Sequence, residues 1–268
     1  MFVIVSGSSG VGKNTVINNL KSKSDKFVLM PTYTTREMRP TEKEGEPYFY
    51  ISLEEFQNKI RDRELIEYEY IHNNYYGSSY AIFEQYSKMG KIIIKDIGVE
   101  GAQNLCKKLD GKDNIVKFFL TVKHKSELKK RLKGRHEKDI KLRLRRFDYE
   151  QKQICKFDFV IYNNDLQETT KQIIEILNLG KDDFLPNVEP KKLNKYKIKY
   201  YLNKLKCGKD LKPVKIALQN GKAYIVSGVE RYVASRLAKK PIAKVLTKRN
   251  IKKQIQTSAD WCNKIFGA

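Results

Sequence analysis

The stretch GSSGVGKNT, residues 7–15, follows the apolar run Phe2–Val5 and leads into a segment with helical spacing. Gly7, Gly12 and Lys13 fit the pattern G-x-x-x-x-G-K, in which glycines let backbone N–H groups turn toward phosphate oxygens. The N-terminus of the following helix adds its partial positive charge. A strand, a glycine loop and a helix in this order predict a phosphate-binding loop, with Lys13 reaching the terminal phosphates.

Short apolar strands alternate with amphipathic helices over the first 180 residues. Ser52 with Glu55 predicts a capping box, and Ser126 is expected to cap a later helix. The alternation predicts a mostly parallel sheet with helices on both faces. The expected strands are 2–5, 91–97, 116–122 and 157–163, and the expected helices are 15–23, 53–63, 126–153 and 165–178.

A second pattern follows a segment that contains prolines, a glycine and charges, GKDDFLPNVEPKK. A helix is expected at 195–206, then two strands around the turn Asn220-Gly221, a helix over ERYVASRLAKK and a strand at 242–247. We therefore expect three parts, which are a domain at 1–180, a linker at 181–192 and a second domain at 193–268.

Charge is spread unevenly along the chain, which has a net charge of +23. Residues 187–268 hold 21 Lys and Arg against 4 Asp and Glu, or +17. This excess favours a polyanionic partner such as DNA or RNA. A solvated lysine-rich surface without such a partner is the alternative.

Other features bound the class of protein. The four cysteines form no CxxC pair, so we expect reduced thiols rather than a zinc site or disulfides. No stretch approaches the roughly 18 apolar residues of a membrane helix. Met1 leads directly into the first strand, which leaves no room for a signal peptide. We expect a soluble, cytoplasmic protein, and its oligomeric state is not predicted.

Two further segments carry residues suited to a nucleotide. TTREMRPTEKEGEPYFYIS sets Arg36, Arg39 and Tyr48 close together, and guanidinium groups hold phosphate oxygens bidentately. ELIEYEYIHNNYYGSS contains Glu67 upstream of Tyr76. A carboxylate can accept two N–H bonds from one base edge, and guanine offers such a pair at N1 and N2.

At these residues the chain resembles the guanylate kinase family, over residues 2 to about 180. The phosphate loop, TTREMRP, EGEPYFYIS, NNYYGS, KDI and RLKGR occur in the family's order and spacing. The resemblance implies a P-loop NTPase fold and transfer of the γ-phosphoryl group of ATP to GMP or dGMP, with Mg²⁺.

The resemblance also implies roles for single residues. The residues implied for ATP are Gly7, Ser8, Ser9, Gly10, Val11, Gly12, Lys13, Asn14, Thr15 and, near the adenine, Asn163. Those implied for GMP are Arg36, Arg39, Tyr48 and Tyr76 at the phosphate and Glu67 and Ser78 at the guanine. Those implied for catalysis are Lys13, Asp96 and the lid arginines Arg131, Arg135 and Arg143.

Four positions depart from the family pattern. Asn14 replaces the usual magnesium-binding serine or threonine, so the metal ligands stay unassigned. Tyr33 stands where a small hydroxyl residue is common, and Gly98 stands where a second aspartate is common. Lys95 lies in a strand that should be buried. These departures leave the base preference and the metal geometry open.

Residues 193–250 resemble the ParB/sulfiredoxin superfamily, as a small α+β domain. Gly228, Glu230, Arg231 and Ala234 match its G-x-[E/R]-R-x-x-A segment, which implies binding of a nucleotide phosphate at a helix N-terminus. Ser227 stands where an acidic residue is frequent, which argues against hydrolytic or kinase chemistry there. A small domain without activity is the alternative.

Two other functions remain open for the first domain. One is a kinase of the same fold that acts on a modified base in DNA, although such a substrate offers no free monophosphate to Arg36 and Arg39. The other is a catalytically silent scaffold that binds a phosphorylated partner, although Gly7, Gly12 and Lys13 are intact.

Overall fold

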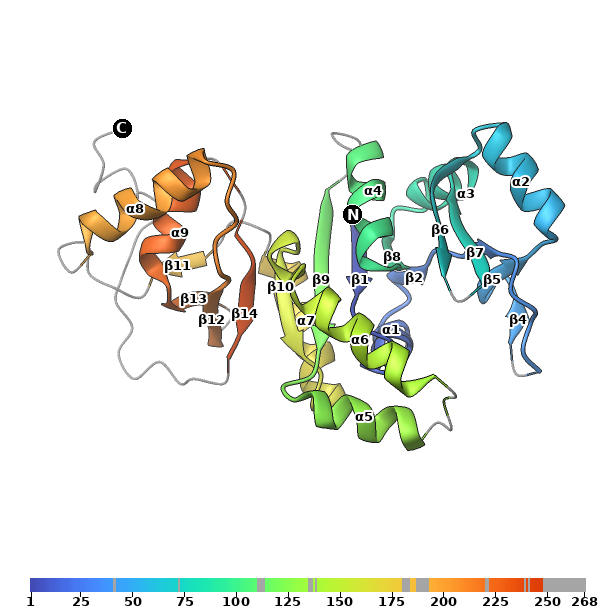
Figure 1. Cartoon of the computed structure of the whole chain (residues 1–268), viewed down its shortest axis with the longest axis horizontal. Helices are drawn as coiled ribbons and strands as arrows, with labels where there is room; N and C mark the ends of the chain where they lie inside the picture. Colours follow the sequence, from blue (N-terminus) through green and yellow to red (C-terminus); the bar gives the residue numbers. More distant parts are fainter. Residues whose placement is uncertain are drawn as a thin grey trace. The chain divides into compact units, whose positions relative to one another are not determined.

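The computed structural model describes most of the chain, and its residues fall into two compact units, Met1–Lys117 and Phe118–Ala268. We describe each unit by itself (Figure 1). The predicted domain boundary at residue 180 stays a prediction. The described residues are 1–40, 42–71, 73–109, 114–134, 137, 139–179, 184–186, 193–219, 222–238, 240 and 242–247.

The first unit contains a parallel set of strands in which β8 (Ile92–Asp96) lies between β1 (Phe2–Ser6) and β2 (Phe27–Leu29). Every residue of β1 is buried, as expected for a strand covered on both faces. The register pairs Val5 with Asp96, so the phosphate loop after β1 and the carboxylate that ends β8 lie at the same edge. The helices of this unit are α1 (Lys13–Lys23), α2 (Leu53–Arg61), α3 (Tyr80–Ser87) and α4 (Val99–Lys108).

A second, five-stranded sheet in this unit was not predicted from the sequence. Its order is β4 (Lys43–Glu44), β5 (Pro47–Tyr50), β3 (Thr32–Thr34), β7 (Asn74–Ser79) and β6 (Leu65–Ile71). Helix α4 packs against β6. The predicted capping box of α2 is confirmed, since the Ser52 side chain accepts from the Glu55 N–H and the Glu55 carboxylate accepts from the Ser52 N–H.

The second unit is also built on a mainly parallel sheet, and β9 begins just before the unit does. Strand β10 (Phe159–Tyr162) pairs with β9 (Ile115–Thr121) and with β14 (Lys244–Leu246), both parallel. Strand β12 (Val214–Gln219) continues the sheet beside β14, and β13 (Lys222–Ser227) runs antiparallel to β12. The helices of this unit are α5 (Lys125–Gly134), α6 (Ile140–Gln151), α7 (Leu166–Leu179), α8 (Lys195–Lys206) and α9 (Val229–Leu237), with a short 3-10 helix at Ile154–Lys156.

Two predicted elements differ from the structure. The single helix expected at 126–153 is wrong, because α5 ends at Gly134 and α6 begins at Ile140. Helix α5 also begins at Lys125, so Ser126 lies inside it and does not cap it. Of the expected linker 181–192, only 184–186 are described; they form β11 (Phe184–Pro186), parallel to β13, and the rest lies outside the described residues.

The described helices hold no segment with the length and apolar character needed to cross a bilayer.

Candidate active site

The phosphate loop has the backbone that its glycines predict. Gly7, Gly10 and Gly12 have φ values of 140°, 89° and 96°, a region that side chains rarely adopt. Helix α1 begins at Lys13, directly after Gly12. The loop can therefore present N–H groups and a helix N-terminus to one anion. Of the other predicted loop residues, Ser8 and Val11 are buried, and Ser9 is half-buried.

Lys13 lies close to the carboxylate that ends β8. Its ammonium group donates to the Gly7 carbonyl at 2.7 Å, and its Nζ is 3.8 Å from Asp96 Oδ1. Burial raises the pKa of the Asp96 carboxyl, and the charges of Lys13 and Lys95 oppose that rise. The structure thus places the predicted Lys13 and Asp96 together. Asn14 and Thr15 are exposed at the start of α1.

Arg36 lies in a cluster of tyrosines and is held by one carboxylate. Its Nη2 donates to both oxygens of Glu42 at 2.8 Å. Its guanidinium lies 5.2 Å from the centre of the Tyr48 ring, and the Tyr48 ring lies 5.9 Å from the Tyr76 ring. Three predicted phosphate-binding residues, Arg36, Tyr48 and Tyr76, are therefore brought together. Arg39 is exposed and meets Glu42 through its backbone: its N–H donates to the Glu42 carboxylate at 3.0 Å, and its carbonyl accepts from the Glu42 N–H at 3.0 Å.

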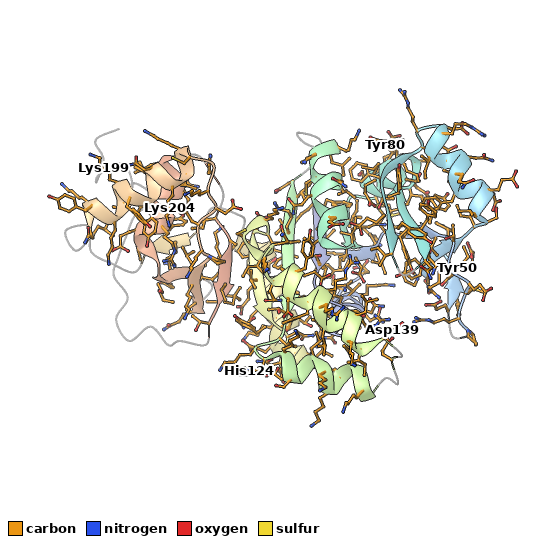
Figure 2. All side chains as sticks on the ribbon, viewed as in Figure 1. Tyr50, Tyr80, His124, Asp139, Lys199 and Lys204 are labelled. Carbon is orange, nitrogen blue, oxygen red and sulfur yellow. The ribbon has the colours of Figure 1, made fainter. Side chains whose placement is uncertain are left out.

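Tyr50 belongs to this cluster and was missed in the sequence. Its hydroxyl donates to Glu42 at 2.7 Å, and burial together with the Glu42 carboxylate raises its pKa to about 12. Figure 2 labels Tyr50 on β5. Because side chains alternate along a strand, Tyr50 shares a face with Tyr48, two residues earlier. That spacing was the signal that could have revealed it. Burial, with Asp96 next, also raises the pKa of Tyr48.

Glu67 and Ser78, predicted to read guanine, are cross-strand partners on β6 and β7. Both are buried, and the Ser78 hydroxyl donates to Glu67 Oε1. Burial raises the pKa of the Glu67 carboxyl, while the Ser78 hydroxyl and the charge of Lys95 oppose that rise. The pair therefore forms a buried acceptor whose geometry is fixed by the strand register.

Lys95 is fully buried in β8, beside these carboxylates. Its ammonium group donates to the Pro31 carbonyl at 2.9 Å and to Thr32 Oγ1 at 2.6 Å. Burial lowers its pKa to about 8, against the opposing charges of Glu67 and Asp96. The sequence marked Lys95 as unusual but did not identify these contacts.

Tyr33, the other unusual residue nearby, packs away from this network. Its ring lies 5.5 Å from the Phe49 ring and 4.7 Å from Lys59 Nζ. Since Thr32 precedes Tyr33 in β3 and receives Lys95, the two side chains point to opposite faces of the strand. The bulky residue therefore does not compete with Lys95 for space.

The predicted lid and adenine residues belong to the second unit. Arg131 Nη2 donates to the Asn163 carbonyl at 2.8 Å, so α5 is tied to the end of β10. Asn163 is buried, and its N–H donates to the Thr121 carbonyl at 2.8 Å. Arg143 Nη2 pairs with Glu137 Oε2 at 2.8 Å. The predicted Arg135 lies outside the described residues.

The turn before α9 is glycine for a conformational reason. Gly228 has a φ of 83°, and Arg231 folds back over it. The Arg231 guanidinium donates to the carbonyls of Lys212 and Pro213, each at 3.1 Å. Arg231 thus stabilises the turn in this structure.

Metal ligands do not cluster in the part of the chain that is described: it holds no group of three His, Cys, Asp or Glu suited to a metal ion.

Comparisons with known proteins match the region that contains these sites. The sequence profile of the guanylate kinase family matches residues 1–179. A guanylate kinase of Prochlorococcus marinus (strain MED4) is 35% identical over 178 residues, which are 65% of this chain and 95% of the relative. One of Campylobacter jejuni (strain RM1221) is 36% identical over 179 residues, 65% of this chain and 86% of the relative.

A solved structure agrees with the sequence matches. The crystal structure of guanylate kinase from Anaplasma phagocytophilum gives a TM-score of 0.54 at 26% identity, over 66% of this chain and 84% of that chain. The C-terminal strands and helices lie beyond residue 179, outside the matched range. The chain belongs to the guanylate kinase family.

Proposed function

We propose that this chain transfers the γ-phosphoryl group of ATP to GMP or dGMP, giving ADP and GDP or dGDP. The observation that carries the proposal is that one compact unit combines the phosphate loop, with Lys13 beside Asp96, and a second cationic cluster around Arg36. A kinase that transfers a phosphoryl group from one phosphorylated substrate to another needs two anion sites, whereas a simple ATPase needs only one.

The acceptor would bind through the tyrosine cluster and the buried carboxylate. Arg36 would exchange Glu42 for the GMP phosphate, with Tyr48 and Tyr76 donating their hydroxyls. Arg39 would swing in from the surface. Glu67 would accept the N1 and N2 hydrogens of guanine, and Ser78 would fix the carboxylate. Adenine offers no such donor pair, which accounts for base selection.

Phosphoryl transfer needs positioning and charge neutralisation rather than a strong base, because the acceptor phosphate is already ionised. Lys13 and the loop amides would hold the β- and γ-phosphates. The family resemblance implies that Arg131, Arg135 and Arg143 neutralise charge on the ATP phosphates and that Asn163 lies near the adenine. Arg131 and Arg143 would leave their present partners to do so.

Mg²⁺ fits the donor chemistry of the first unit. This ion takes oxygen ligands and is often held by one or two carboxylates together with substrate phosphates and water. Asp96 supplies such a carboxylate close to Lys13, and the exposed Asn14 supplies an amide oxygen. When bound, Mg²⁺ would neutralise charge that develops on the phosphates.

A coupled assay of ADP release tests the proposal with GMP, dGMP, AMP, UMP and duplex DNA as acceptors. We expect turnover with GMP or dGMP, and a loss of at least about 100-fold in kcat for Lys13→Ala, because a charge contact to the transferring group is removed. Lys21→Ala, an exposed lysine later in α1, is the matched control. Activity only with DNA would favour a modified-base kinase, and activity with no acceptor would favour a silent scaffold.

We propose a nucleic-acid contact as a second function, made by helix α8. This helix contains five lysines and no acidic residue, and Tyr196 and Tyr200, one turn apart, are 87% and 54% exposed. Lys204 Nζ lies 4.7 Å from the centre of the Tyr200 ring, and Figure 2 labels Lys199 and Lys204 on the helix. Exposed aromatic rings among lysines suit stacked bases with a neighbouring phosphate backbone.

Binding of the full chain to fluorescent single-stranded DNA tests this contact. We expect an affinity that falls with salt, and a further loss of about 10-fold or more for Tyr196→Ala with Tyr200→Ala. A DNA affinity that changes neither with salt nor with the two tyrosine substitutions would contradict a nucleic-acid contact at α8.

We also propose that the hairpin β12–β13 with α9 and β14 is a ParB/sulfiredoxin-like module. The order of elements and the left-handed Gly228 before α9 support the relationship. Arg231 is engaged with backbone carbonyls, so a phosphate would have to be held by the N–H groups of α9.

A further inference from the structure

We propose that Glu69 is a second guanine-reading carboxylate, which accepts the hydrogen of the 2-amino group that Glu67 leaves unpaired. This inference rests on the proposed GMP site. It assigns to Glu69 the place that a side chain at residue 98 would otherwise fill.

Two carboxylates of β6 reach the first turn of α4 together. Glu67 and Glu69 are two residues apart and share one face of the strand, while Tyr68 and Tyr70 are exposed on the other. The Gly101 N–H donates to Glu69 Oε1, and a Cβ placed on Gly101 would lie 2.9 Å from Glu67 Oε2. Both side chains therefore converge on the same turn.

Gly98 shows that Glu69 occupies space that a side chain would need. A Cβ placed on Gly98 would lie 2.7 Å from Glu69 Oε2, closer than real Cβ atoms come to another heavy atom. The backbone of Gly98, with φ −63° and ψ 166°, is one that any residue adopts. A side chain at residue 98 would therefore need the Glu69 carboxylate to move, although the backbone conformation would accept it. The aspartate common at this position in the family would collide with Glu69.

Guanine has more donors than Glu67 alone can accept in the plane. Its edge presents one hydrogen on N1 and two on the 2-amino group, and a bidentate carboxylate takes N1–H with one amino hydrogen. Glu67 Oε1 also accepts from Ser78. The remaining amino hydrogen would be buried without a partner, which costs about 1–3 kcal/mol. Glu69 offers an acceptor at the next position on the same strand face.

The local field tolerates two neighbouring carboxylates. The N-terminus of α4 carries a partial positive charge, and its Gly101 N–H donates directly to Glu69. The buried ammonium of Lys95 stabilises the charge on Glu67. Each carboxylate therefore has a donor or a cation beside it.

Steady-state kinetics with GMP and IMP test the role of Glu69, because IMP lacks the 2-amino group. We expect Glu69→Ala to lower kcat/KM for GMP about 10- to 100-fold and for IMP less than 3-fold, in line with a lost charged hydrogen bond. Glu69→Gln, which keeps one carbonyl acceptor, should fall between. Glu100→Ala removes an exposed carboxylate from the same turn of α4 and should leave the GMP-to-IMP ratio unchanged. If Glu69→Ala leaves the ratio of kcat/KM for GMP to that for IMP unchanged, the proposal is overturned.

A double variant separates recognition from folding. Gly98→Asp alone should lower GMP activity, because the new side chain meets Glu69. In Glu69→Ala with Gly98→Asp, the new carboxylate has the space and should recover at least about half of the lost selectivity on a logarithmic scale. If the double variant prefers GMP over IMP no more than Glu69→Ala does, a carboxylate at residue 98 does not replace the one at residue 69, and the proposal is contradicted.

Calorimetry measures the affinities for GMP and IMP without turnover, so it tests the role of Glu69 separately from the proposed kinase activity. If the unaltered chain binds GMP but does not phosphorylate it, the kinase proposal fails and the affinity ratio for Glu69→Ala still decides the role of Glu69. If it binds no GMP, both proposals fail.

Discussion

Lys95 puts an ammonium group inside the first unit, where most strands would place an apolar side chain. Burying a charge is unfavourable, and here the cost is offset by hydrogen bonds to Pro31 and Thr32 and by the charges of Glu67 and Asp96. The same residue links the carboxylate proposed to read the base with the one proposed to lie near the phosphates. Its effect on the proposed site is therefore electrostatic.

The lowered pKa of Lys95 makes stability depend on pH. Its folded-state pKa of about 8 lies below the ordinary 10.5, so between these values the unfolded chain binds more protons and stability rises with pH. From pH 7 to 9.5 we expect this group to add about 2 kcal/mol to the free energy of unfolding. Lys95→Met should lack that gain, and urea unfolding at the two pH values measures it.

An exposed lysine provides the control for this experiment. Lys88 directly follows α3 and is exposed, so Lys88→Met should keep the full pH dependence of the unaltered chain. An identical pH dependence in Lys95→Met and the unaltered chain would show that the pKa of Lys95 is not lowered and that Lys95 stays charged in the folded chain over this range.

At the residue scale, the sequence predicted groups that act through their own chemistry. Lys13 with Asp96, and Glu67 with Ser78, lie together as expected. The sequence did not predict that Glu42 would hold Arg36. That contact depends on how the segment after β3 folds back, and no periodicity encodes it.

At the scale of elements, two serines with similar surroundings in the sequence behave differently. Ser52 precedes α2 and caps it, whereas Ser126 lies inside α5. Loss of an N-cap costs about 1 kcal/mol, so Ser52→Ala should speed hydrogen exchange in α2 about 5-fold. Ser126→Ala should leave exchange in α5 nearly unchanged. Mass spectrometry of peptides covering 53–61 and 125–134 compares them.

The outcome of this comparison also measures what local sequence can predict. Faster exchange in both serine variants would mean that Ser126 caps α5 in solution after all.

The capping box could be predicted because its partner, Glu55, lies three residues away in the sequence. The five-stranded sheet was missed because β4 has two residues and β3 has three, and β3 pairs with β7 across about 40 residues of sequence.

At the scale of the whole molecule, the C-terminal region does more than follow the kinase-like part. The family match ends at residue 179, yet β14 pairs with β10 in parallel, and the Lys244 N–H donates to the Asp158 carbonyl at 2.9 Å. Without β14, β10 would present unpaired backbone groups at the edge of its sheet. Exposed edges of this kind favour self-association. The added strands therefore protect an edge of the second unit.

Truncation tests whether this protection matters. A chain cut after Leu179 loses β14 and should melt at least about 5 °C lower than the full chain, since the pairing and the burial of Phe159 against Lys244 are lost. It should also self-associate at high protein concentration. A chain cut after Thr247 keeps β14 and is the matched control. Melting curves and light scattering give both readouts. If the shorter chain does not self-associate and has the same melting temperature as the control, the edge of β10 is stable without β14. The C-terminal region would then contribute only ligand binding.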